Sequence, residues 1–229
     1  MSFFSSLKFV LSRPHPEARP FLLISALLSS MSYWASRQFR CSFLRYIGHM
    51  STTFFAFCLY FFRDPERVTP THPDIVVAPA DGRIISVEKV VPPQELDIGT
   101  IPVWRIAIFL SVLNVHVNRV PATGTVTRIR YTPGLFISAH LDKASQDNER
   151  NAITITLPDH RTITVVQIAG LIARRIVCSI TEGTSVRIGE RLGLIRFGSR
   201  TDVYLPPDVE PLVFVGQTMI GGETILACL

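Results

Sequence analysis

Two long apolar stretches dominate the first part of the chain. The first runs from Phe21 to Ser36 and the second from Tyr46 to Phe62, so each is about 16 or 17 residues long. This length is just short of what a straight helix needs to cross a bilayer. We therefore expect residues 1–67 to form a membrane-associated helical segment.

Basic and aromatic residues border these stretches. Arg37, Arg40 and Arg45 separate them, and other Lys and Arg residues flank them outside, so charge gives no orientation across a membrane. The second stretch is rich in Phe and Tyr, which favour the bilayer interface. A helical hairpin that dips into one leaflet and helices that lie flat on the surface both remain open. The alternative interpretation is that the two stretches do not contact a membrane and are instead core helices of a soluble domain.

From Asp74 onward the pattern changes to short β-type runs separated by Gly and Pro turns. The predicted strands include Leu113–Val120, Thr201–Leu205 and Leu212–Val215. Many short strands at close spacing are typical of sandwiches and barrels. Residues 68–229 are therefore predicted to form a compact, mainly β domain of the barrel-sandwich type, whose Gly turns resemble pieces of biotinyl and lipoyl carriers.

Composition narrows the choice of partners. The chain is 47% hydrophobic and only 18% charged, with a net charge of +5. A basic balance suits nucleic acid or an anionic membrane surface, and the apolar excess favours the membrane, so no nucleic-acid partner is expected. The four cysteines lack the spacing of metal ligands, and no metal site is expected.

The dipeptide Gly198-Ser199 is the first candidate for chemistry. It lies between two strand-like runs, and a serine that follows glycine in a strained turn can attack its own main chain. Cleavage there would separate residues 1–198 from residues 199–229. The competing interpretation is a turn serine that caps local backbone groups, which is far commoner for a bare Gly-Ser.

Two further residues could assist such a serine. In an alternating strand His116 would share one face with Asn114 and Asn118, which is unusual for a core face; a solvated face is the alternative. Asp81, in an Ala-Asp-Gly turn, could orient a histidine or take a proton. An aspartate chosen for turn geometry explains it equally well.

A polar stretch supplies candidates for substrate binding. His140 and the run that contains Asn148 and Arg150 could bind a phosphate or a charged head group. A solvated loop is the alternative. The chain has no Gly-rich phosphate loop, no HExxH and no GxSxG elbow, which disfavours those enzyme classes.

Taken together, these segments resemble the short, membrane-associated form of the phosphatidylserine decarboxylase family. The resemblance covers most of the chain, and the order and spacing of the segments make it specific. The matching segments are Phe61–Arg67, Ala78–Gly82, Phe109–Ser111, His116, Asn118–Pro121, Tyr131–Gly134, Asn148–Arg150, Gln167–Gly170 and Phe197–Ser199.

The resemblance implies a pyruvoyl-dependent lyase of phospholipid biosynthesis that is made as a zymogen. Ser199 would attack the Gly198 carbonyl, and autocatalytic cleavage would leave a large chain, 1–198, and a small pyruvoyl chain, 199–229. The serine amine of the substrate then forms a Schiff base with the pyruvoyl ketone. This imine withdraws electrons from the Cα–carboxylate bond as carbon dioxide leaves. Phosphatidylethanolamine is the product.

The resemblance also suggests roles for single residues. In longer members an aspartate and a histidine assist cleavage, and a histidine assists decarboxylation. Asp81 fits the first place, and His116 matches one of two histidines in the corresponding strand, whereas Arg119 stands at the other. Phe197 and Arg200 flank the Gly-Ser where Leu and Thr are common, which leaves open how Ser199 is activated.

The implied partners are phosphatidylserine in an anionic membrane and the two chains of one precursor as a heterodimer. We expect a peripheral or shallowly inserted protein at the cell membrane, with its catalytic domain facing the cytoplasm. Two other functions remain open. One is a membrane-tethered carrier or binding module without chemistry, although no lysine stands at its tight turn. The other is a pyruvoyl decarboxylase of a soluble amino acid.

Overall fold

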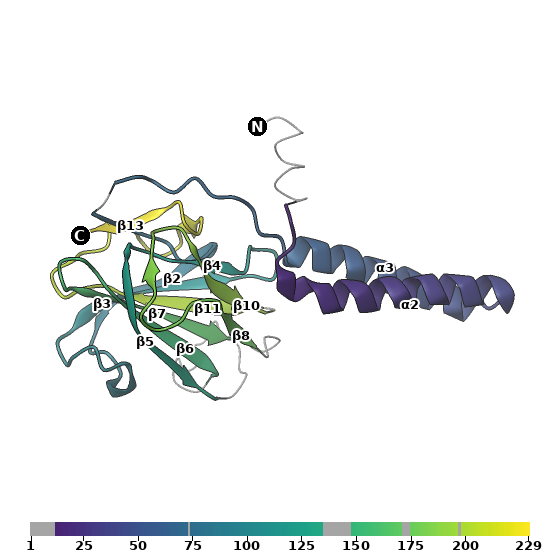
Figure 1. Ribbon diagram of the computed structural model, residues 1–229, viewed down its shortest axis with the longest axis horizontal. Coiled ribbons are helices and arrows are strands. Elements are labelled where there is room, and N and C mark those ends of the chain that lie inside the picture. The colour runs from purple at the N-terminus through teal and green to yellow at the C-terminus, as the bar shows by residue number, and fades with distance from the viewer. Residues whose placement is uncertain (1–11, 73, 135–147, 171–174, 197) are drawn as a thin grey trace. The chain divides into compact units, whose positions relative to one another are not determined.

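The computed structural model describes residues 12–72, 74–134, 148–170, 175–196 and 198–229 (Figure 1). Contacts within the chain define two compact units, Met1–Glu66 and Arg67–Leu229. The first unit is helical and the second is built from strands. The prediction of a mainly β protein with N-terminal helices is confirmed.

The first unit contains two long antiparallel helices. A short 3-10 turn, η1 (Pro16–Ala18), leads into α2 (Arg19–Gln38), and α3 (Ser42–Phe61) follows after three residues. Both helices coincide with the apolar stretches of the sequence. Arg40 turns the chain between them in the left-handed region, at φ 49°. Among the described residues, neither helix is both long and apolar enough to span a bilayer.

The polarity of this helix pair is the reverse of that of a helical hairpin in water. Small residues of both helices are buried, whereas most of the large apolar ones face outward; Trp34 is 68% exposed, and Phe61 at the end of α3 is the buried exception among the described residues. Hydroxyl groups join the helices at the Ser29 and Thr52 oxygens, 2.7 Å apart, and Tyr33 bonds His49 at 2.9 Å. We call α2 and α3 the inverted hairpin.

The second unit consists of three antiparallel sheets. The largest has eight strands in the order β12-β2-β3-β11-β7-β6-β5-β9, and the smaller ones have the orders β4-β10-β8 and β1-β13 (Figure 1). The strands are β1 Ile75–Val77, β2 Gly82–Val90, β3 Val103–Leu110, β4 Val117–Arg119, β5 Gly124–Thr132, β6 Arg150–Thr156, β7 Thr162–Ala169, β8 Ile176–Cys178, β9 Ser185–Val186, β10 Arg191–Ile195, β11 Ser199–Tyr204, β12 Thr218–Met219 and β13 Ile225–Cys228.

Both faces of the large sheet are covered near its centre. On one face, residues of β2, β3 and β11 pack with β13, while Leu192 of β10 packs with β5, β6 and β7. On the other face, the segment around η2 (Gln94–Leu96) places Leu96 against Val166, Ile168 and Tyr204. Strand β11 therefore has no exposed residue, although its sequence, SRTDVY, is largely polar.

Two predicted strands differ from the structure. Only Val117–Arg119 of the predicted strand Leu113–Val120 is extended, because Asn114 closes a turn by accepting hydrogen bonds from the backbone and hydroxyl of Ser111. The predicted strand Leu212–Val215 is also wrong. Its residues lead into a turn in which the Phe214 N–H donates to the Gln217 side chain.

Candidate functional site

Ser199 is the first residue of β11 and lies in the interior of the second unit. Its neighbours across the sheet are Leu110 of β3 and Ala169 of β7. The side chain is fully buried. Gly198, just before it, has φ +77°, a backbone conformation that residues other than glycine rarely adopt. The predicted cleavage site therefore lies where a left-handed turn enters a buried strand.

His116 lies within hydrogen-bonding distance of this hydroxyl. It is fully buried just before β4, and its Nδ1 lies 3.4 Å from the Ser199 Oγ. Its Nε2 lies 3.1 Å from the Ser111 carbonyl, which can only accept, so Nε2 carries the proton. In the neutral ring Nδ1 is then unprotonated and faces the hydroxyl. The predicted pair of His116 and Ser199 is therefore in hydrogen-bonding geometry.

The Gly198 carbonyl has a donor of its own. The backbone N–H of Gly170, just after β7, lies 3.1 Å from the Gly198 oxygen. The carbonyl of the same peptide unit, that of Ala169, accepts a 2.7 Å hydrogen bond from the Asn148 side chain. Asn148 is fully buried. Asn148, a predicted substrate-binding residue, thus lies one peptide away from the predicted cleavage site.

The other two predicted binding residues are not part of this group. Arg150 pairs with Ile168 in the sheet, one position from Ala169, so its side chain points to the opposite face from Ser199. There its Nε donates to Glu95 at 2.8 Å. His140 lies outside the described residues. No observation tests the binding roles of these residues, which stay predictions.

Asp81 lies at the same end of the large sheet as Ser199. Arg83 pairs with Phe109, and Phe109 pairs with Arg200, which puts the start of β2 two strands away from the start of β11, about 10 Å at ordinary strand spacing. Gly82 is needed here, because a Cβ at this position would lie 2.2 Å from the Phe109 oxygen. The catalytic role predicted for Asp81 is not tested by this placement.

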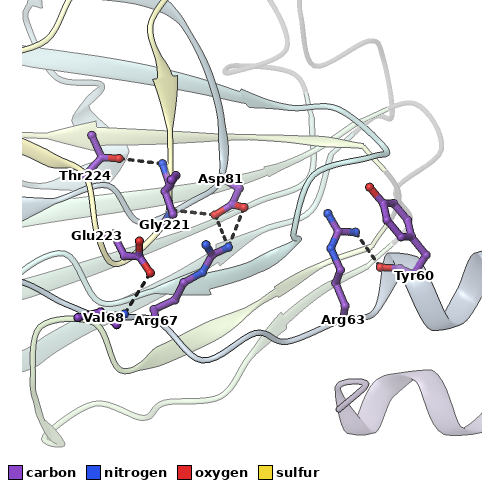
Figure 2. A network of polar contacts seen from close by, with 9 residues as sticks. Tyr60, Arg63, Arg67, Val68, Asp81, Gly221, Glu223 and Thr224 are labelled. Atoms are coloured by element: carbon purple, nitrogen blue, oxygen red, sulfur yellow. Dashed lines mark hydrogen bonds and ion pairs between the residues drawn. The ribbon is translucent and has the colours of Figure 1, made fainter. Parts of the chain in front are cut away.

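The Asp81 carboxylate has well-defined partners, which Figure 2 shows. One Arg67 nitrogen lies 2.8 Å from both carboxylate oxygens, and the Gly221 N–H donates to one of them at 2.8 Å. The Arg67 and Asp81 side chains are 6% and 14% exposed. The aspartate therefore joins the beginning of the second unit to its C-terminal segment.

Three other buried polar groups near Ser199 were not predicted. The side-chain oxygen of Asn118, Oδ1, accepts a hydrogen bond from the Gln167 side chain at 2.8 Å, and Gln167 lies opposite Thr201 in the sheet. On the other face, the Arg200 guanidinium forms two bonds, of 2.6 and 2.9 Å, with Asp202. Arg119, at the place of the family's second histidine, donates to the Gly189 carbonyl at 3.2 Å. The sequence contains no local signal for these long-range contacts.

Comparison with known proteins decides the family. The model of the family described as phosphatidylserine decarboxylase matches residues 54–227. The chain belongs to the phosphatidylserine decarboxylase family. This confirms the resemblance drawn from the sequence, and with it the prediction of an enzyme of the carboxy-lyase class.

Curated relatives of the phosphatidylserine decarboxylase family extend over the whole chain. A phosphatidylserine decarboxylase proenzyme of Gluconacetobacter diazotrophicus is 63% identical over 229 residues, which is 100% of both chains. The proenzyme of Gluconobacter oxydans is 58% identical with the same coverage. The proenzyme of Cereibacter sphaeroides is 56% identical over 217 residues, 94% of this chain and 89% of its own.

Proposed function

We propose that this protein decarboxylates phosphatidylserine to phosphatidylethanolamine and carbon dioxide, using a pyruvoyl group that it makes from Ser199 by cleaving its own chain after Gly198. The observation that carries the proposal is the 3.4 Å contact between the Ser199 hydroxyl and Nδ1 of His116, in a chain of this family. A buried serine beside a base is the arrangement that activates a hydroxyl nucleophile.

The first step of cleavage is an acyl shift from nitrogen to oxygen. The Ser199 Oγ forms a bond to the Gly198 carbonyl carbon, its proton passes to His116 Nδ1, and the carbonyl electron pair moves to the Gly198 oxygen. When that pair returns, the bond to the Ser199 nitrogen breaks, and the nitrogen takes the proton back from His116. The result is an ester between the Gly198 carbonyl and the Ser199 side chain.

The ester then breaks by elimination. Loss of the Ser199 Cα proton and of the Cβ–Oγ bond releases Gly198 as a carboxylate and leaves a dehydroalanine at the new amino end. Addition of water and loss of ammonia convert it to the pyruvoyl ketone. Once formed, the ketone would supply the electron sink for the pair that stays on the amino-acid Cα when carbon dioxide leaves. The burial of Ser199 keeps water away from this position, which favours loss of a charged carboxylate as a neutral molecule.

The sheet pairing supports a stable complex of the two product chains. The small chain, 199–229, would contribute β11 between β3 and β7, β12 beside β2, and β13 beside β1. All three of its strands pair with strands of the large chain, 1–198. We propose that the chains remain together as a heterodimer after cleavage.

The inverted hairpin supports association with an anionic membrane. Its outward side chains are large and apolar, while serine and glycine residues face inward, as in helices that pack within lipid. The net charge of +5 favours anionic lipid such as the proposed substrate. We propose a peripheral or shallowly inserted protein at the cell membrane, with the second unit on the cytoplasmic side.

Mass spectrometry of the purified protein tests cleavage and cofactor together. We expect two fragments, 1–198 and 199–229, with a small chain that reacts with hydroxylamine or borohydride, and an uncut Ser199→Ala variant. Activity is then compared on phosphatidylserine vesicles and on free serine. An uncut wild-type chain would favour the carrier interpretation, and activity on free serine alone would favour a decarboxylase of a soluble amino acid.

A further inference from the structure

We propose that the peptide unit between Ala169 and Gly170 stabilises the oxyanion of self-cleavage, and that Asn148 is the positioning residue that holds this peptide in place. The inference rests on the proposed cleavage after Gly198. It gives Asn148 a role in making the cofactor, in place of the substrate-binding role predicted from the sequence.

The geometry begins at the carbonyl under attack. Negative charge develops on the Gly198 oxygen when the Ser199 hydroxyl adds to its carbon, and the Gly170 N–H points at this oxygen from 3.1 Å. Backbone N–H groups at about 2.7–3.1 Å from such an oxygen are the usual donors of an oxyanion hole. His116 approaches the Ser199 hydroxyl, so base and donor act on different atoms of the same reaction.

The donor peptide is held from the neighbouring strand. The Asn148 side chain donates to the Ala169 carbonyl at 2.7 Å, and the Ala169 N–H donates to the Glu149 carbonyl at 2.9 Å. Ala169 is thus fixed at both its oxygen and its nitrogen by two successive residues. Because Ser199 pairs with Ala169 in the sheet, this bracing also sets the Gly170 N–H against Gly198.

The Asn148 hydrogen bond also affects the strength of the donor. Drawing electron density toward the Ala169 oxygen makes the N–H of the same peptide unit a better donor, since hydrogen bonds in a chain polarise one another. Asn148 and Ala169 are both fully buried, where such interactions are screened less than in water. Removing an oxyanion donor outright slows a reaction about 10²–10³-fold. Loss of its positioning residue should cost less, and we expect about 10–100-fold.

The test measures the rate of cleavage of newly made precursor. Asn148→Ala removes the donor, and Asn148→Asp keeps the shape but places a carboxylate against the Ala169 carbonyl. Asn151→Asp is the matched control, because Asn151 is also buried but donates to Gln167, at 3.2 Å. We expect slow cleavage in both Asn148 variants and cleavage near the wild-type rate in the control. Thermal unfolding in a Ser199→Ala background separates folding from chemistry.

The Asn148→Asp variant offers a signature that a structural role would not produce. Protonation of the introduced carboxyl restores a donor to the Ala169 oxygen, so its cleavage relative to wild type should rise as pH falls. Wild-type cleavage should show no such rise, because the Asn148 amide does not titrate. Once processed, the Asn148 variants should turn over phosphatidylserine with a near-normal KM.

The outcomes separate this inference from the proposed function. If wild type cleaves and the Asn148 variants cleave equally fast, the inference alone is overturned. Normal cleavage with a raised KM would restore the substrate-binding role and would also overturn it. An uncut wild-type chain would overturn the proposed function and this inference with it.

Discussion

His116 and Ser199 are 83 positions apart in the chain, yet Nδ1 of the histidine and Oγ of the serine lie 3.4 Å apart in the interior of the second unit. The contact arises because β11 pairs with β3, and the chain turns directly after β3 to bring His116 back over the sheet. The bond from Nε2 to Ser111 closes that turn. The same bond orients the imidazole ring, so the fold of this turn also determines which ring nitrogen faces Ser199.

Replacing the base should slow self-cleavage without unfolding the protein. His116→Gln can still donate to the Ser111 carbonyl but cannot take the Ser199 proton, and we expect cleavage to slow about 10²–10⁴-fold. The measurement is a time course of precursor and fragments on denaturing gels. His72→Gln, at an exposed histidine, is the control and should cleave normally. Equal rates in the two variants would remove His116 from the reaction.

Breaking the ion pair of Asp81 should destabilise the second unit. Asp81→Asn removes the negative charge that pairs with the buried Arg67 cation, and we expect a loss of about 3–5 kcal/mol in the free energy of unfolding. Denaturant titration in a Ser199→Ala background measures it. Asp208→Asn breaks an exposed pair with Arg161 and should cost less than about 1 kcal/mol.

The same variant bears on cleavage. We expect Asp81→Asn to slow the cut after Gly198. If the effect passes through the ion pair, Arg67→Ala slows it as well. Normal processing in Asp81→Asn would leave Asp81 with a structural role only.

The buried pair of Arg200 and Asp202 should behave as a unit. Arg200→Leu removes two charged hydrogen bonds from the buried Asp202 carboxylate and should destabilise the fold by about 3–5 kcal/mol. The double variant Arg200→Leu/Asp202→Leu removes both charges and should recover most of that loss. A double-mutant cycle on the uncleaved Ser199→Ala chain measures the coupling. Additive losses would show that the two charges act independently.

Alkaline pH should weaken the fold through Tyr204. Burial, with a further contribution from the Asp202 charge, raises the pKa of Tyr204 to about 12. Because the folded-state pKa lies above the ordinary value of about 10, the neutral phenol contributes stability below pH 10, and this is lost between pH 10 and 12. The contribution is about 3 kcal/mol. Tyr204→Phe should flatten the stability curve across this range, and an unchanged curve would contradict the assignment.

The outward face of the inverted hairpin should enter lipid. Trp34 and Trp104 are the two tryptophans of the chain, so Trp104→Phe makes the emission report on Trp34 alone. We expect a blue shift on addition of phosphatidylserine vesicles. The shift should be weaker at high salt, because screening weakens the attraction to anionic lipid, and weaker with neutral vesicles, which lack that attraction. Emission that stays at the position typical of water would exclude insertion of this face.

The sequence predicted elements that depend on local pattern. The apolar stretches became α2 and α3, and the predicted strand Thr201–Leu205 became most of β11. The turn at Asn114 was missed, because a side chain that closes a turn leaves no mark on hydrophobic periodicity. Leu212–Val215 reads as a strand by composition, but local bonds at Phe214 and Gln217 end the extended run.

The site was predictable only in its reactive residues. Ser199 and His116 stand in motifs with a family pattern, so the resemblance could name them. The bracing of Ala169 by Asn148 joins positions that only the pairing of β6 with β7 brings together, and strand register cannot be derived from either segment alone. The burial of Arg200 and Asp202 was missed for the same reason, since their charge alone suggests exposed positions.

Strand β11 carries Ser199 at its first position and is paired along its whole length on both sides. A ketone made there would be part of the protein's own covalent framework, anchored in the middle of a sheet. Enzymes that borrow a diffusible coenzyme can discard a spoiled copy and load another, whereas this one would have no means of repair. Each molecule would serve until the first irreversible reaction at that carbon, and the cell would renew its capacity only by synthesising new protein.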